Sequence, residues 1–248
     1  TRYSGLARSP LDESFVLAGN SGGGNMVFKF TSTGELQWAR LLTSGSGLPA
    51  THLTGDVGGG CTIAFSSEGA GNIIELMQLD AVGDLAFARV YTLNSSTSRM
   101  MVFDMMTSAT GEIIVGGAHR ELQGIFGTEN YFFLLRLDPS GTLDQYQVFS
   151  NGLSPAWSTG GGLFEDSAGS VWLNDEFGCV RTGPDGYGQY GFHRVVNETS
   201  GYRISWTIDA HRFVQGSDTV WVGGSVLIEN LILGGAIIRP FLSAMPQR

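Results

Sequence analysis

Short apolar runs separated by small-residue turns fill most of the chain. The stretch 100–150 shows them best, as MMVFDMMTS (100–108), EIIVGGAH (112–119), YFFLLRLD (131–138) and TLDQYQVFS (142–150). Short runs rich in β-branched and aromatic residues and bounded by turn residues are typical of β-strands. The turns ATG and PSG join the first pair and the last pair, and a long loop at 117–131 separates the pairs. The pattern predicts a four-stranded antiparallel sheet.

The same pattern recurs along the chain. The turn before the fourth strand reads TSTGELQWAR (31–40), DAVGDLAFAR (80–89), DPSGTLDQYQ (138–147) and GPDGYGQYGF (183–192). An earlier landmark, the second strand of each repeat, is centred on Leu17, Ile63, Val115, Leu173 and Val222. Both landmarks repeat about every 50 residues. A period near this length, built from four short strands, is typical of a propeller blade.

We therefore predict an all-β chain forming a single β-propeller domain over residues 1–248. The expected blades are 4–46, 50–94, 99–150, 155–197 and 202–248. The last repeat lacks a clear fourth strand, and TRYSG at the N-terminus resembles the end of one, so N-terminal residues are candidates for closing the last blade. In the alternative interpretation, the chain is a piece of a longer propeller with six or seven blades.

The repeat resembles the bacterial β-propeller repeat proteins of the SBBP type. The segments GIFGTENYFFLLRLDPSGTL (124–143) and GGGNMVFKFTSTGELQWAR (22–40) carry the resemblance, whereas CVRTGPDGYGQY in the fourth repeat departs from it. The resemblance implies a propeller, in a secreted or surface-anchored bacterial protein that is often one module of a larger polypeptide. It transfers no catalytic residues to this chain.

Composition narrows the expected partners. Glycine accounts for 37 of the 248 residues, and charged residues for only 15%. The net charge is −9 and no cluster of Lys and Arg occurs, so we expect no nucleic-acid binding. No apolar run reaches the roughly 20 residues of a membrane helix, so we expect no membrane insertion. Cys61 and Cys179 are expected to be buried free thiols, with a disulfide as the alternative.

Two hypotheses assign roles to the carboxylates on or near the strands that we expect to lie innermost in the propeller. Some five-bladed glycosidases use three axial carboxylates, and here Asp104, Asp209 and Glu165 are the alternative axial set. Asp56 and Asp166 occupy the same position in their repeats, seven residues before Ile63 and Leu173, just ahead of glycine-containing turns. A repeated position predicts a structural role, in which each aspartate bonds the backbone of its own turn.

The long loop at 117–131 is the candidate binding segment, because loops carry binding function more often than strands do. Its candidate residues are His119, Arg120, Glu121, Glu129, Asn130 and Tyr131. The four histidines have no metal-ligand spacing and no phosphate-binding loop is present, so we expect no metal and no cofactor. Five tryptophans recur about once per repeat, and we expect them to pack between blades.

A chain of structural repeats without a catalytic constellation favours a non-enzymatic, extracellular interaction module that binds a protein partner or a surface glycan. The first alternative is a five-bladed glycoside hydrolase-like enzyme that uses the axial carboxylates. The second is a subunit of a surface appendage or secretion assembly.

Overall fold

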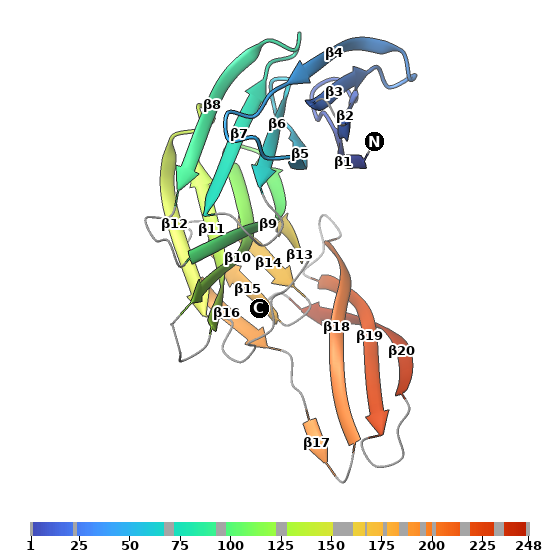
Figure 1. Cartoon of the computed structure of the whole chain (residues 1–248). Helices are drawn as coiled ribbons and strands as arrows, with labels where there is room; N and C mark the ends of the chain where they lie inside the picture. The colour runs from blue at the N-terminus through green and yellow to red at the C-terminus, as the bar shows by residue number, and fades with distance from the viewer. Residues whose placement is uncertain are drawn as a thin grey trace. The chain divides into compact units, whose positions relative to one another are not determined.

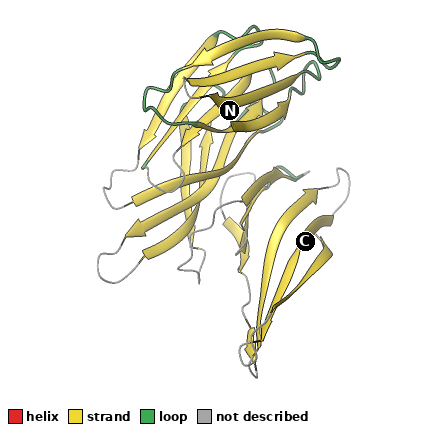
Figure 2. Ribbon diagram, turned by 45° about the vertical axis from the view of Figure 1, so that its right-hand side comes forward, coloured by secondary structure: helices red, strands yellow, loops and turns green. Residues whose placement is uncertain are grey.

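The computed structural model describes most of the backbone of this chain. The described residues are 2–21, 24–66, 72–92, 98–122, 128–150, 161–166, 168–175, 178–183, 188–193, 197–199, 202–213, 219–230 and 236–246, and the described side chains lie within 5–183. In this part of the chain every regular element is a strand (Figure 2). No helix there has the length and hydrophobicity that crossing a membrane requires.

Each sheet consists of four strands that follow one another in the sequence and pair in that order (Figure 1). The first sheet is β1 (Arg2–Arg8), β2 (Phe15–Ser21), β3 (Gly24–Phe30) and β4 (Leu36–Leu42). The second is β5 (Ala50–Gly55), β6 (Cys61–Ser66), β7 (Ile73–Leu79) and β8 (Leu85–Thr92). The third is β9 (Ser98–Thr107), β10 (Ile113–Leu122), β11 (Thr128–Leu137) and β12 (Leu143–Ser150).

The fourth and fifth sheets follow the same rule. The fourth is β13 (Gly161–Glu165), β14 (Val171–Asp175), β15 (Gly178–Thr182) and β16 (Gly188–His193). The fifth is β17 (Asn197–Thr199), β18 (Tyr202–Phe213), β19 (Thr219–Asn230) and β20 (Ala236–Pro246). The described residues thus form five four-stranded antiparallel sheets, in agreement with the predicted fold class.

The repeated turn joins the third strand of a sheet to the fourth, as the sequence predicts. In the first sheet Thr31 donates its N–H to the carbonyl of Glu35, 2.8 Å away, and Gly34 donates to the carbonyl of Thr31, 3.0 Å away. The same two bonds close the turns at Gly83 and Gly141. Gly34 has a φ of 89°, which glycine adopts without steric cost. The fourth predicted turn, at Gly186, lies outside the described residues.

Backbone contacts divide the chain into two compact units, Thr1–Glu129 with Phe133–Val148, and Asn130–Phe132 with Phe149–Arg248. Apolar side chains fill the spaces between neighbouring sheets of the first unit. One cluster, which includes Val27, Trp38 and Ile63, lies between the first and second sheets. Another, which includes Leu76 and Val115, lies between the second and third. The assignment of all 248 residues to a single domain remains a prediction.

Two boundaries differ from those expected. Arg2–Arg8 pair with β2 in the first sheet. The last sheet is completed by the short β17, which is the first of its four strands, and not by the N-terminal strand. The loop expected at 117–131 is mostly strand. β10 continues to Leu122 because residues 117–121 pair with β9, and β11 starts at Thr128.

Cys61 is a buried free thiol, as predicted. Burial raises the pKa of this thiol to about 12, so it is inert at neutral pH. The side chain of Cys179 lies outside the described residues.

Candidate functional site

Asp56 and Asp166 both bond the backbone of their own turns. The Oδ1 of Asp56 accepts the N–H groups of Gly58 and Gly60, at 2.7 and 2.9 Å. The Oδ1 of Asp166 accepts those of Ala168 and Ser170, at 3.0 and 2.9 Å. The shared register of the two aspartates therefore reflects a turn-closing role, as the sequence predicts.

Asp166 also anchors its sheet. Its Oδ2 accepts the indole N–H of Trp172 at 3.0 Å and the guanidinium of Arg181 at 2.9 Å. Arg181 in turn lies over the Trp172 ring, 5.5 Å from its centroid. Burial alone would raise the pKa of Asp166, but the hydrogen bonds from Trp172 and Arg181 outweigh it and lower the pKa. This carboxylate therefore stabilises its own sheet through bonds to two of its strands.

The alternative axial residues fall on different units. Asp104 lies on β9 in the first unit, where its Oδ1 accepts the N–H of Met105 at 2.8 Å. Glu165 is the last residue of β13 and lies in the second unit. Asp209 occupies a β-bulge in β18 of that unit, and its side chain lies outside the described residues. The structure gives no distance that joins the three carboxylates.

Within the first unit, Asp104 acts electrostatically on His52 of β5. Each of the two residues directly follows a bulge in its own strand, so they hold equivalent positions in the second and third sheets. Burial lowers the pKa of His52, and the negative charge of Asp104 opposes that shift. The Nδ1 of His52 is buried without a hydrogen-bond partner among the described residues. The sequence had not linked these two side chains.

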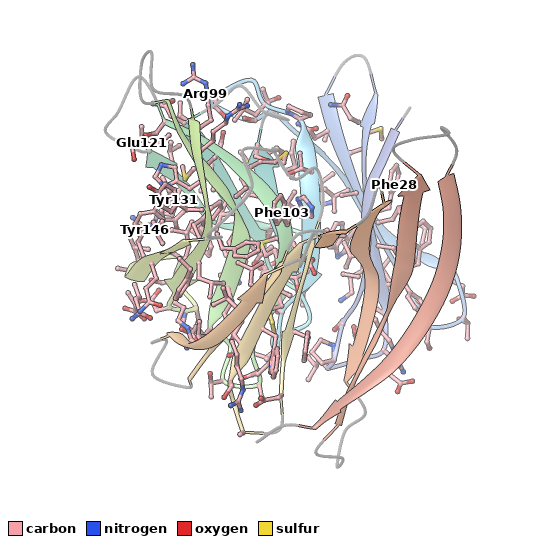
Figure 3. The ribbon with its side chains drawn as sticks, turned by 90° about the horizontal axis from the view of Figure 1, so that it is seen from below. Phe28, Arg99, Phe103, Glu121, Tyr131 and Tyr146 are labelled. Atoms are coloured by element: carbon pink, nitrogen blue, oxygen red, sulfur yellow. The ribbon has the colours of Figure 1, made fainter. Side chains whose placement is uncertain are left out.

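Two of the predicted binding residues, His119 and Glu121, share one face of β10. His119 approaches the hydroxyl of Tyr146 on β12, with its Nδ1 3.2 Å from the oxygen, and the Tyr146 ring lies 6.4 Å from that of Phe133. Burial, with the charge of Glu121 adding to it, raises the pKa of Tyr146 to about 12. Figure 3 shows Glu121 and Tyr146 on the same side of the third sheet.

The remaining predicted binding residues are more scattered. Arg120 lies opposite Arg99 of β9, and because neighbouring residues of a strand face opposite sides, it does not share the face of His119 and Glu121. Tyr131 is partly exposed on β11, whereas the side chains of Glu129 and Asn130 lie outside the described residues. Sequence reasoning missed the contact of Tyr146 with His119, because residue 119 was assigned to a loop and not to a strand of the same sheet.

Buried charges bridge the first and second sheets. Lys29, the chain's single lysine, is 2% exposed and donates to the carbonyl of Gly59 at 2.6 Å and to Asp12 at 3.0 Å. Glu75 is 3% exposed, and its carboxylate accepts four hydrogen bonds from Ser44, Gly45 and Ser46. Burial would raise the pKa of Glu75, but these bonds outweigh it and lower the pKa.

Fourth-strand side chains hold the turn of the next sheet. Trp38 donates its indole N–H to the carbonyl of Ala81 at 2.9 Å, and Arg40 donates to the carbonyl of Gly83 at 2.8 Å. Tyr91 donates to the carbonyl of Gly141 at 2.5 Å in the following pair of sheets. The expected role of tryptophan between blades is therefore confirmed for Trp38.

Exposed apolar residues gather around these turns. Leu36, Leu85 and Leu143 follow the turn glycines of three successive sheets at the same offset, and their exposed fractions are 57%, 58% and 46%. We call them the turn leucines. Their recurrence is visible in the segments GEL, GDL and GTL, to which the sequence analysis assigned no role.

The described residues contain no group of three or more His, Cys, Asp or Glu side chains arranged to hold a metal ion. In that part of the chain, the structure brings together hydrogen bonds between sheets, the pairs His52–Asp104 and His119–Tyr146, and the exposed turn leucines.

The fold resembles several solved structures. A protein of unknown function from Bacteroides caccae is 14% identical, with a TM-score of 0.52 over 92% of this chain and 72% of that one. The Pan2 WD40 domain of Neurospora crassa is 12% identical, with a TM-score of 0.51 over 96% of this chain and 65% of that one. WD40 domains are β-propellers.

An extracellular domain from Bacteroides thetaiotaomicron gives a TM-score of 0.51 at 14% identity, and this chain spans 30% of it. No protein-family model and no curated protein matches the sequence. At these identities the likeness concerns the fold alone, and together with the five four-stranded sheets it identifies a β-propeller.

Proposed function

We propose that this chain is a non-enzymatic β-propeller module of a secreted or surface bacterial protein, and that it binds a partner protein or a surface glycan. The repeat pattern, which resembles that of SBBP-type propellers, supports the bacterial and extracellular part of the proposal. The hydrogen bonds that the buried carboxylates accept from the protein itself support the non-enzymatic part.

These hydrogen bonds are the observation on which the proposal rests. Asp56, Glu75 and Asp166 are each buried, and each accepts several hydrogen bonds from turns, linkers or neighbouring strands. A catalytic carboxylate needs a lone pair or a proton directed at substrate. These carboxylates instead accept hydrogen bonds from the protein's own turns, linkers and strands, which is the pattern of structural groups.

The alternative enzyme is tested with a broad glycan array on which both binding and cleavage are recorded. We expect no cleavage. Cleavage that disappears in Asp104→Asn or Asp209→Asn, with the unfolding midpoint unchanged, would overturn the proposal and make the chain a hydrolase. Glu35→Gln, which alters an exposed carboxylate in a turn, is the matched control.

A further inference from the structure

The surface that carries the turn leucines has features that the fold does not require. Eleven large apolar side chains are exposed among the described residues, and six of them belong to the turns of the first three sheets or directly follow them. The six are Leu11, Leu36, Val57, Val82, Leu85 and Leu143. We call the surface that they form the turn surface. All six lie in the first unit.

The turn surface is continuous from sheet to sheet. A Cβ placed on Gly59 would lie 3.1 Å from Leu11 and 3.6 Å from Ala81, which is the neighbour of Val82. A Cβ placed on Gly111 would lie 3.3 Å from Val57 and 3.5 Å from Pro139, in the turn that leads to Leu143. The first turns of neighbouring sheets therefore lie side by side, and the first turns of the second and third sheets also lie beside the last turns of their own sheets.

Packing does not account for the turn leucines. The turn itself is closed by backbone bonds and by its glycine. The contact with the next sheet is made two residues later, by Trp38 in the first sheet and by Phe87 in the second, where a Cβ on Gly141 would lie 2.6 Å from the Phe87 ring. A repeated apolar side chain that remains about half exposed is typical of a binding surface.

Carboxylates accompany the turn leucines. Glu35 precedes Leu36, Asp84 precedes Leu85 and Asp144 follows Leu143, and all three acidic side chains are exposed. Asp84 lies 3.5 Å from Arg40. Glu35 and Asp144 form no ion pair with any described residue. The apolar surface is therefore bordered by negative charge.

We propose that the turn surface docks a protein segment in which apolar side chains alternate with Lys or Arg. The turn leucines would contact its apolar side chains, and the carboxylates beside them would attract its cations. The border disfavours an anionic lipid surface, because like charges repel. It disfavours a second copy as well, because each chain carries a net charge of −9. This inference rests on the proposed interaction function and names its surface and partner chemistry.

The test is a selection from a library of random short peptides displayed on phage, with the whole chain as bait. Each enriched peptide is then measured against wild type and against the triple variant Leu36→Ser, Leu85→Ser, Leu143→Ser. The matched control is Leu6→Ser with Leu41→Ser, which are 67% and 64% exposed but lie outside the turn surface. Circular dichroism and the unfolding midpoint establish that every variant is folded.

We expect enriched peptides to combine apolar residues with an excess of Lys and Arg. Their affinity should fall about tenfold or more in the triple variant and stay within about twofold in the control pair. Added salt should weaken binding, because charge attraction contributes.

Peptides that bind wild type and triple variant equally would overturn this inference and leave the proposed module function standing. Enriched peptides that are acidic or neutral would also overturn it. If neither peptides nor glycans bind, both proposals fail. If the chain sediments with phosphatidylserine-containing vesicles and the triple variant does not, the partner is a lipid surface and not a peptide. If the chain forms a dimer in native mass spectrometry and the triple variant does not, the partner is a second copy.

Discussion

The spaces between sheets and the turn surface differ in which side chains they bury and expose. Between the first and second sheets, charged side chains such as Lys29 and Glu75 are almost fully buried, and each is bonded to the neighbouring sheet or to the linker. On the turn surface, leucines are about half exposed. Buried polar groups and exposed apolar groups are the unusual placements in a folded protein, and each needs a reason.

The reasons differ. Hydrogen bonds to Gly59 and to residues 44–46 account for the buried charges between sheets, so that region is explained by stability alone. Stability does not account for the turn leucines, since their sheets are already joined through Trp38 and Phe87. Substitutions between sheets should therefore change folding, and substitutions on the turn surface should change binding.

Glu75→Ala should have the largest effect on folding. It removes the acceptor of four hydrogen bonds, among them the one from the buried Ser44, and leaves a cavity where the carboxylate was. We expect the free energy of unfolding to fall by about 3 kcal/mol, measured by urea denaturation. Glu35→Ala on an exposed turn should change it by less than about 0.5 kcal/mol. Equal losses in the two variants would contradict the structural role of Glu75.

A pair of glycine substitutions separates backbone strain from contact between sheets. Gly34 and Gly83 have φ angles of 89° and 85°, so alanine at either position costs about 1 kcal/mol of strain. A Cβ at Gly34 meets nothing within 4 Å, whereas one at Gly83 lies 2.9 Å from the Trp38 ring. We expect Gly83→Ala to lower the free energy of unfolding by about 1 to 2 kcal/mol more than Gly34→Ala. Equal effects would show that Trp38 does not hold this turn.

Acid should weaken the same region. Folding lowers the pKa of Glu75 from its ordinary value of 4.5, which it keeps in the unfolded chain. Its contribution to the free energy of unfolding is therefore complete above pH 4.5 and is lost as the pH falls through the lower pKa of the folded state. The difference in unfolding free energy between wild type and Glu75→Gln should therefore shrink below about pH 4.5. A difference that stays constant down to pH 3 would contradict the assigned role.

The smallest effect on folding is expected at the turn surface. Replacing the three turn leucines with serine should change the free energy of unfolding by less than about 1 kcal/mol in total, because their side chains are already about half exposed in the folded chain. Thermal unfolding followed by circular dichroism measures this. A loss of several kcal/mol would show that the turn leucines are part of the core.

The repeat of turns and strands was predictable from sequence, because hairpin geometry requires glycine at Gly34, Gly83 and Gly141 and leaves a visible period. The turn roles of Asp56 and Asp166 were predictable for the same reason. The extent of β10 and β11 was not, since strand pairing beyond Gly117 depends on partners in β9. The His119–Tyr146 contact and the exposure of Leu85 depend on which faces neighbouring sheets cover, and local sequence does not encode that.

The most direct test measures binding and stability together on three proteins: wild type, the triple turn-leucine variant and Glu75→Gln. The affinity of the best peptide from the selection and the free energy of unfolding are recorded for each. We predict that the triple variant loses binding and keeps its stability, and that Glu75→Gln loses stability and keeps binding while folded. Loss of both properties in the triple variant, or of binding in Glu75→Gln while it is folded, would contradict the division between structural and binding regions.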